Sequence, residues 1–329
     1  MIHPIPPGSR DVLPEEMREL RRLNRALIEV FEARGYGEVA TPTIEYEAVM
    51  ARGDGRASGA YRFFDESGEL LALRSDMTVP IARLVASRFA EAEMPLRLCY
   101  LASTYRAVTP QRGQLREVVQ AGVELIGAQA PDGTAEIVEV LEAALDAAGL
   151  ERAVIGLGDS DLYRQLLAEF GVDGEAQDSL LTRLARHDLV GLEVELGEAG
   201  IGDDRVATCV ALSQLRGGSE VLEQARELGG EAVERAIARL GETYEALERR
   251  GVADRVQIDM GLLRDLGYYS GAILEVYDPA LGYVLGGGGR YDRLMHNFGL
   301  DLPAAGFGLY LDRVHVAQME EQRRARVEP

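Results

Sequence analysis

The stretch YRAVTPQRGQLREVVQAGVE, residues 105–124, decides the fold. From residue 116 to residue 125 the side chains alternate in polarity with a period of two, which predicts a β-strand. One face of this strand carries Arg116, Val118, Gln120, Gly122 and Glu124, and the opposite face is mostly apolar. Buried charged groups need polar partners, so one interpretation is that the polar face looks into a polar cavity. The pattern fits equally well a solvated outer face of an antiparallel sheet.

A second strand is predicted directly before this one. Residues 96–106 (LRLCYLASTYR) have the composition of a strand, and the segment that follows contains proline and glycine, which suit a long hairpin loop. Folding the two strands back on one another would place Arg106 near Arg116. The same hairpin would bring Arg106 beside Gln120 and Glu124.

The composition describes a folded, acidic protein. The chain has 329 residues, enough for two domains, with 47% hydrophobic and 27% charged residues and a formal net charge of −20. A chain this acidic repels polyphosphate, so nucleic acid is not an expected partner. All the basic residues other than histidine are arginine. The absence of lysine excludes a Schiff-base lysine and a P-loop lysine.

The cysteines and histidines predict neither a metal site nor a cofactor. Cys99 and Cys209 are far apart, and the four histidines form no CxxC, HxxxH or HExxH spacing. Two lone cysteines suit a reducing cytosol. The N-terminal residues lack the apolar core of a signal peptide, and no window is apolar enough to span a membrane. We therefore expect a cytoplasmic protein without a membrane partner.

Three segments are expected along the chain. Residues 1–170 alternate between helix and strand patterns, residues 171–250 are nearly all helical and charged, and strand character resumes over 251–329. The middle segment is interpreted as an inserted helical subdomain, which either docks a partner or covers the sheet. Gly286 to Gly289 follow a predicted strand, but no GK[ST] comes after them, so they do not form a Walker loop.

Asp76 has two possible roles. It follows a predicted hairpin at residues 61–74 and precedes a predicted helix, so the simple interpretation is an N-cap, a frequent role for aspartate. The functional interpretation is a carboxylate held at the end of a strand, where it can bind an ammonium group.

Several motifs together resemble the catalytic core of histidyl-tRNA synthetases. The resemblance runs from PPGSRDVLP at residues 6–14 to AAGFGLYLDR at residues 304–313, and it excludes the helical insertion. Residues 106–124 match the second class II synthetase motif in spacing, and the two histidine-specific motifs match RDLGYY (264–269) and GGRYD (288–292). The resemblance implies an α+β fold, with a class II synthetase-like antiparallel sheet flanked by helices.

The resemblance also implies a histidine pocket. Asp76, Thr78 and Gln120 would hold the α-ammonium group, Arg264 would face the carboxylate, and Glu124 and Tyr269 would bracket the imidazole. A carboxylate accepts a hydrogen bond from an imidazole N–H, and a phenol can donate to or accept from the other nitrogen. The full set of implied histidine-binding residues is Asp76, Thr78, Arg106, Gln120, Glu124, Arg264, Tyr268, Tyr269 and Tyr291.

Departures from the synthetase pattern weaken the implied ATP site. Val108 replaces an acidic residue, Gln114 replaces an arginine, and Val118 replaces the aromatic residue that stacks on adenine. Each loss should cost about 1–3 kcal/mol of binding free energy. Asp76 itself stands in place of a glutamate, between Ser75 and Met77 instead of proline and glycine. The anticodon-binding domain that would follow the core is not expected.

A histidine pocket without an ATP pocket resembles the ATP phosphoribosyltransferase regulatory subunits, a synthetase-like family. This resemblance implies a non-catalytic protein that forms a homodimer within a larger hetero-oligomer. Its partners would be a short catalytic subunit and L-histidine, which exerts feedback on the first step of histidine biosynthesis. The alternatives are a truncated histidine-activating ligase, which would use Arg106, Arg264 and Arg313, and a scaffold whose pocket is vestigial.

Overall fold

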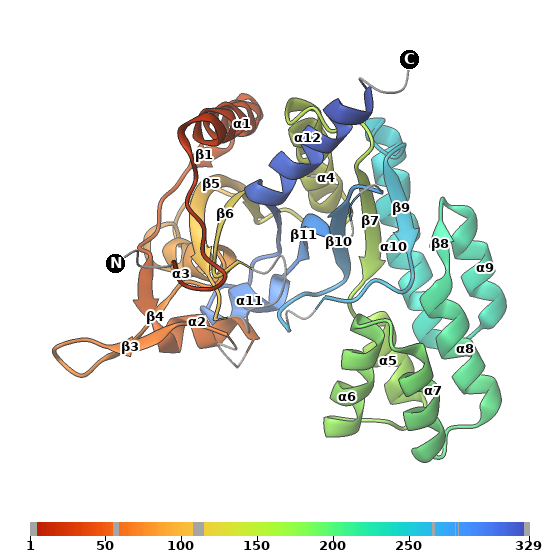
Figure 1. Ribbon diagram of the computed structural model, residues 1–329. Coiled ribbons are helices and arrows are strands. Elements are labelled where there is room, and N and C mark those ends of the chain that lie inside the picture. The colour runs from red at the N-terminus through yellow and green to blue at the C-terminus, as the bar shows by residue number, and fades with distance from the viewer. Residues whose placement is uncertain are drawn as a thin grey trace.

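A nine-stranded sheet forms the centre of the computed structural model, which describes residues 5–54, 59–107, 115–264, 267–279, 281 and 283–325 (Figure 1). Its strands are β1 (Gly37–Glu38), β5 (Leu96–Tyr105), β6 (Glu117–Ile126), β7 (Val154–Asp159), β8 (Arg216–Gly217), β9 (Val256–Asp259), β10 (Ala272–Tyr277), β11 (Val284–Arg290) and β12 (Ala304–Tyr310). They lie in the order β1-β5-β6-β12-β11-β10-β7-β9-β8. Two neighbouring pairs, β1 with β5 and β7 with β9, are parallel, and the others are antiparallel. The predicted α+β class with a mostly antiparallel sheet is confirmed.

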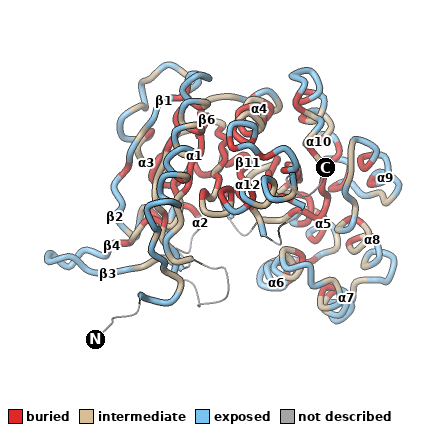
Figure 2. The backbone as a smooth tube through the Cα atoms, turned by 45° about the horizontal axis from the view of Figure 1, so that its top comes forward, coloured by how far each residue is buried: buried red, intermediate tan, exposed pale blue. Residues whose placement is uncertain are grey.

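A second, three-stranded sheet contains the predicted hairpin. Its order is β2-β4-β3, formed by β2 (Ile44–Tyr46), β4 (Leu70–Leu73) and β3 (Arg62–Phe64). The Asp65 carboxylate stabilises the turn between β3 and β4 by accepting hydrogen bonds from the backbone N–H groups of Ser67 and Glu69, both at 2.9 Å. All of β3 is exposed (Figure 2).

Helices cover both faces of the large sheet. They are α1 (Pro14–Ala33), α2 (Glu47–Asp54), α3 (Thr78–Arg88), α4 (Asp132–Ala147), α5 (Leu162–Glu169), α6 (Gly174–Ala185), α7 (Leu189–Glu198), α8 (Asp203–Gln214), α9 (Glu220–Leu228), α10 (Glu231–Arg250), α11 (Asp292–Asn297) and α12 (Leu311–Ala325). On one face, α1, α4, α10 and α12 pack on the strands. On the other, α2, α3 and α11 pack together over the site (Figure 1). Among the helices of the described residues, none has the length and apolarity needed to cross a membrane.

The strand pair β5–β6 confirms the hairpin and decides between the two interpretations of its polar face. Val119, Ala121, Val123 and Leu125 pack into the core on the side of α1 and α4. Glu124 is only 1% exposed on the opposite face, so that face lies in the interior and the solvated alternative is wrong. The two arginines meet as predicted, because the Arg106 N–H donates to the Arg116 carbonyl at 2.9 Å. The prediction that Arg106 lies beside Glu124 is wrong, because the register places Leu98 opposite Glu124. The Arg116 side chain, however, points away to the Pro7 carbonyl.

The helical segment 171–250 contacts the sheet directly. The helices α5 to α8 form a lobe beside the sheet, whereas α10 crosses it and contacts α4, β7 and β10 (Figure 1). The short strand β8 adds to the edge of the large sheet beside β9. One face of α10 is apolar and buried, with Val233, Ile237, Leu240 and Leu247 in the core. The domain boundaries at residues 171 and 250 remain a prediction.

A buried ion pair attaches α10 to the sheet and gives a first testable prediction. The Asp159 side chain is fully buried and accepts two hydrogen bonds from Arg239, at 2.6 and 2.9 Å. Arg239→Met would leave this carboxylate buried without its partner, so we expect a loss of about 3–5 kcal/mol in the free energy of unfolding. The control Arg235→Met removes an exposed pair with Glu169 one turn earlier and should cost less than about 1 kcal/mol. Urea denaturation measures both variants, and equal losses would contradict the prediction.

Candidate functional site

The floor of the candidate site is built from glycines on neighbouring strands. In the register of β6 and β12, Glu124 lies opposite Gly306, Gly122 opposite Gly308, and Gln120 opposite Tyr310. A Cβ atom added to Gly306 would overlap the Glu124 carboxylate, so no larger residue fits beneath it. The missing side chains leave room on this face of the sheet for the polar groups of β6.

Glu124 is the buried carboxyl group of the site. Its oxygens accept hydrogen bonds from Thr78 Oγ1, at 2.8 Å, and from the Tyr291 hydroxyl. Burial raises the pKa of Glu124 to about 8, and the nearby Asp76 charge adds to this, although the two hydrogen bonds oppose the increase. At neutral pH burial therefore favours the protonated form of this carboxyl group.

Tyrosine rings enclose the carboxyl group. Tyr268 lies with its ring centroid 5.0 Å from that of Tyr269 and 6.2 Å from that of Tyr291, the latter in an edge-to-face arrangement. All three rings are buried. Burial, followed by the Glu124 charge, raises the pKa of Tyr291 well above its ordinary value, so its hydroxyl stays a hydrogen-bond donor.

Tyr100 is a site residue that the sequence analysis missed. Its hydroxyl lies over Gly122 and Gly308, where a Cβ atom on either glycine would collide with it. The alternation of side chains along the predicted β5–β6 hairpin could have identified Tyr100. It is directly opposite Gly122 and therefore shares the face of Glu124. No residue of the predicted set came from β5.

Asp76 caps helix α3, as the simple interpretation predicted. Its Oδ1 accepts a hydrogen bond from the Val79 N–H at 2.9 Å. Its Oδ2 accepts a hydrogen bond from the Ser75 hydroxyl at 3.5 Å. The capping role leaves the functional interpretation open, because Asp76 is close enough to raise the pKa of Glu124. Arg106 joins this region by donating from Nε to the Ser75 carbonyl at 3.3 Å.

Arg264 supplies the positive charge of the site. Its guanidinium donates to the Leu274 carbonyl at 3.0 Å and lies 6.0 Å from the centre of the Tyr269 ring. A Cβ atom on Gly287 would overlap this guanidinium, so the glycine on β11 makes its position possible. Among the described carboxylates, none forms an ion pair with Arg264, and Glu275 interacts with its charge only at longer range. A guanidinium without a carboxylate partner is suited to a ligand that brings one.

Gln120 is 7% exposed, and its side chain forms no hydrogen bond with the described residues. The amide of Gln120 therefore keeps donors and an acceptor for a ligand.

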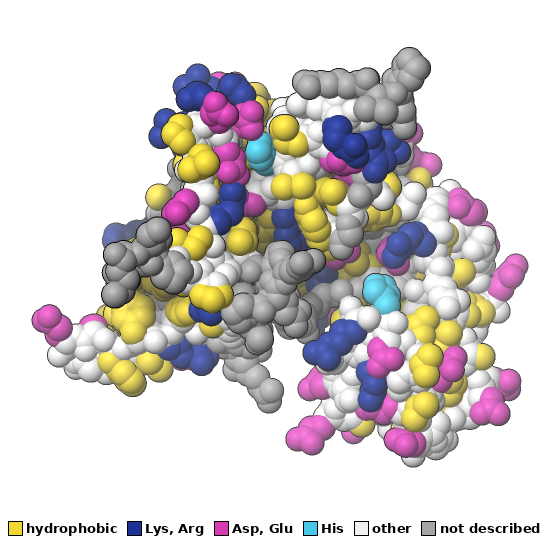
Figure 3. Space-filling view, in the orientation of Figure 1, with side chains coloured by type: hydrophobic (Ala, Val, Ile, Leu, Met, Phe, Trp, Pro, Cys, Tyr) yellow, Lys and Arg dark blue, Asp and Glu magenta, His cyan; other side chains and the backbone are white. Residues whose placement is uncertain are grey.

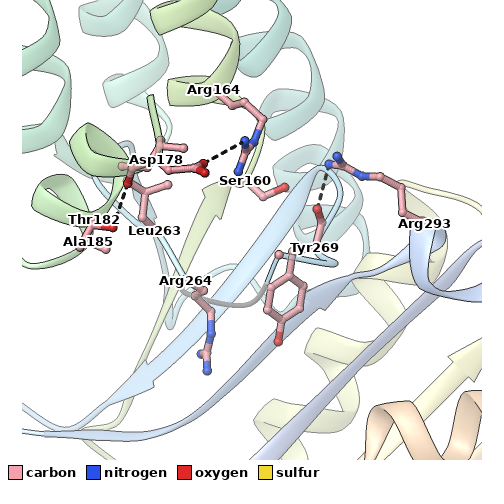
Figure 4. A pocket seen from close by; sticks show the side chains of 11 residues that line it. Ser160, Arg164, Asp178, Thr182, Ala185, Leu263, Arg264, Tyr269 and Arg293 are labelled. Carbon is pink, nitrogen blue, oxygen red and sulfur yellow. Dashed lines mark hydrogen bonds and ion pairs between the residues drawn. The ribbon is translucent and has the colours of Figure 1, made fainter. Parts of the chain in front are cut away.

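A cavity of about 410 Å³ adjoins the site on the side of α5 and α6. Arg264 and Tyr269 form part of its wall, opposite Arg164 (Figure 4). Arg293 lines it as well and donates to the Tyr269 carbonyl at 2.9 Å. The space-filling view shows a hollow between the α5–α8 lobe and the sheet region, with arginine side chains near it and acidic side chains on the outer surface of the lobe (Figure 3).

The structure brings most of the predicted set together. Thr78, Tyr268, Tyr269 and Tyr291 surround Glu124, and Asp76 and Arg264 are within electrostatic reach of Tyr269. The substituted positions Val108 and Gln114, and the loop around them, lie outside the described residues. In the part of the chain that the structure describes, no group of three His, Cys, Asp or Glu side chains could hold a metal ion.

Comparisons with known proteins decide the family. The family model for histidyl-tRNA synthetase matches residues 8–314. A relative from Symbiobacterium thermophilum, named ATP phosphoribosyltransferase regulatory subunit, is 43% identical over 99% of this chain and 82% of its own length. The chain belongs to the family of ATP phosphoribosyltransferase regulatory subunits.

Solved structures place this regulatory-subunit chain in the class II synthetase-like fold, as predicted. A Bacillus halodurans structure, titled ATP phosphoribosyltransferase regulatory subunit/histidyl-tRNA synthetase, has a TM-score of 0.88 and 33% identity, with 97% of this chain and 84% of that chain covered. A histidine–tRNA ligase subunit from Alicyclobacillus acidocaldarius has a TM-score of 0.86 and 29% identity, with 98% and 99% covered.

Proposed function

We propose that the chain is a non-catalytic regulatory subunit which activates a short ATP phosphoribosyltransferase catalytic subunit and senses histidine. It would act as a homodimer within a cytoplasmic hetero-oligomer, at the first step of histidine biosynthesis. One observation supports this most strongly. Tyr269 lies within electrostatic reach of both a buried carboxyl group with a raised pKa, Glu124, and a guanidinium without an ion pair to the described carboxylates, Arg264. Histidine carries the complementary groups, an imidazole and a carboxylate.

In this proposal each end of histidine has its own contacts. Asp76, Thr78 and Gln120 bind the α-ammonium group, Arg264 binds the carboxylate, and Glu124 and Tyr269 bind the imidazole. The remaining members of the proposed pocket are Arg106, Tyr268 and Tyr291. Glu124 is protonated before binding, so it can pass its proton to the imidazole and form an imidazolium–carboxylate pair without net proton release at neutral pH.

Histidine would regulate by binding one conformation of the assembly more tightly than another. Coupling free energies between two sites are typically about 1–3 kcal/mol, which corresponds to about 5–150-fold in affinity. For histidine to inhibit, the conformation that binds histidine more tightly has to be the one in which the catalytic subunit is less active.

The test mixes the purified full chain with a short ATP phosphoribosyltransferase catalytic subunit. We expect a stable complex on a sizing column, phosphoribosyl transfer that requires the regulatory chain, and inhibition by histidine. Calorimetric titration of the regulatory chain alone should show saturable histidine binding. Transfer that does not change on addition of the chain, together with no heat of histidine binding, would refute the proposal.

A histidine-activating ligase is the second candidate. It is favoured by the similarity to the structure named as a histidine–tRNA ligase subunit, and by the presence of Arg106, Arg264 and Arg313. A histidine-dependent exchange between pyrophosphate and ATP separates the candidates. The ligase requires this exchange, whereas the regulatory subunit should show none.

A further inference from the structure

On the face of β12 that forms the floor of the site, two glycines are followed by a large aromatic residue at the end of the strand. Gly306 and Gly308 lie beneath Glu124 and Tyr100, but the next residue on that face is Tyr310, which lies directly opposite Gln120. The strand thus leaves room over two positions and fills the third with a large aromatic ring. Tyr310 was not among the residues that the sequence analysis selected.

Three arginines surround the Tyr310 side chain. The Arg313 guanidinium lies 4.7 Å from the centre of its ring, and the positive charge of Arg264 acts on its hydroxyl. Arg106 adds a third positive charge. Burial alone would raise the pKa of Tyr310, but the charges of the three arginines outweigh it and lower the pKa below that of a free tyrosine. The phenol therefore occupies a strongly positive position.

The three arginines have no ion-pair partner among the described carboxylates, although the chain carries a net charge of −20. Arg106 and Arg264 donate instead to the carbonyls of Ser75 and Leu274, and Arg313 donates to the Val284 carbonyl at 2.6 Å. Converging guanidinium groups without carboxylates are an arrangement that binds phosphates or carboxylates.

The planar guanidinium of Arg313 already contacts aromatic rings of the chain. Besides Tyr310, the ring of Tyr283 lies 5.7 Å from this group. A guanidinium plane is a stacking surface for a nucleobase, and here two tyrosines of the chain already contact it. The Tyr310 ring therefore hinders a nucleotide in two ways. It fills the space between the three arginines, and it covers the surface of Arg313 on which a nucleobase would stack.

We propose that Tyr310 is the specificity-determining residue that excludes nucleoside triphosphates from this pocket, and that the three arginines would bind a triphosphate if its ring were removed. The pocket then admits a single amino acid and rejects the larger, more highly charged nucleotide. The proposal goes beyond histidine sensing, because it concerns exclusion of nucleotide and can be tested without histidine.

The test measures ATP binding to the full-length wild type and to Tyr310→Ala by calorimetry. We expect weak or no binding to the wild type and a dissociation constant at least about 30-fold lower for the variant, since stacking and charge contacts each contribute about tenfold. Tyr310→Phe keeps the ring and should behave as the wild type. Tyr283→Ala is the matched control, because it removes the more exposed ring from Arg313 and leaves Tyr310 in place.

Three results of the binding measurements would overturn the proposal. They are wild-type binding as tight as that of Tyr310→Ala, an equal gain in Tyr283→Ala, and a folded Tyr310→Ala without any gain. Circular dichroism reports folding, and Tyr310→Thr, with its higher strand propensity, replaces the alanine variant if that one does not fold. If neither variant folds, a crystal of the wild type soaked with ATP decides. Adenine stacked on Arg313 would refute the proposal, and an unchanged Tyr310 without nucleotide would support it.

Discussion

Glu124→Gln is expected to weaken histidine binding by about 30-fold or more while making the empty protein more stable at alkaline pH. The amide can still accept a hydrogen bond from the imidazole, but it cannot form the imidazolium–carboxylate pair. Hydrogen bonds to charged groups contribute about 1.5–3 kcal/mol. The variant keeps the size of the side chain above Gly306, so the loss reports charge and not packing.

The pH dependence of binding gives a second signature of the same residue. An imidazolium–carboxylate pair requires one proton between two groups, the ligand imidazole with a pKa of ~6.5 and Glu124 with a pKa of about 8. Wild-type affinity should therefore be highest between these values and fall by up to tenfold per pH unit outside them. The affinity of Glu124→Gln for histidine should not show the decrease above pH 8 that deprotonation of Glu124 causes in the wild type.

Glu124→Gln changes stability in the direction opposite to binding: it weakens histidine binding but stabilises the folded protein at alkaline pH. Burial raises the pKa of Glu124 from its ordinary value of 4.5 to about 8, so the folded protein favours the protonated form. The wild type then loses stability as the pH rises from 4.5 to about 8, at up to ~1.4 kcal/mol per pH unit, whereas glutamine does not titrate. The free energies of unfolding of the two proteins should be similar near pH 4.5 and differ most above pH 8.

Calorimetry and urea denaturation across this pH range check both effects. Glu117→Gln is the control, because Glu117 is an exposed carboxylate at the start of the same strand. It should change neither the affinity nor the pH dependence. A Glu124→Gln variant that binds histidine as tightly as the wild type would exclude Glu124 from the binding site.

Arg264→Met is expected to weaken histidine binding by about 30-fold or more without lowering stability. Truncating one partner of a buried charge pair costs about 2–5 kcal/mol of binding free energy, and in this proposal the pair forms with the ligand carboxylate. In the empty protein the guanidinium has no carboxylate partner among the described residues, so its removal takes away a buried charge with no ion pair.

Histamine, which lacks the carboxylate, distinguishes a direct contact from a general disturbance of the site. Histamine should bind to Arg264→Met as it binds to the wild type, since Arg264 has no carboxylate to contact. The matched control is Arg164→Met, which lines the same cavity from α5 and should leave histidine affinity nearly unchanged. Equal losses for histidine and histamine would contradict a role for Arg264 in carboxylate recognition.

Sequence patterns predicted the structure best where the feature depends on a single strand or a single helix end. The alternation from residue 116 to residue 125 predicted which side chains of β6 share a face, and the chemistry of Asp76 predicted its capping of α3. The interior position of that face was left open, because one strand does not reveal what packs in front of it. Helices α2, α3 and α11 supply that layer.

The sequence by itself determined the strand hairpin, since local periodicity specifies which side chains point together. The class of fold and the set of candidate pocket residues were implied by the resemblance of its motifs to histidyl-tRNA synthetases. Only the tertiary structure decided which strand lies beside β6. That strand is β12, more than a hundred residues away in the chain, and its register places Gly306 beneath Glu124 and Tyr310 opposite Gln120. Cross-strand contacts of this kind depend on long-range pairing, which no local pattern encodes, so Tyr310 emerged only from the folded protein.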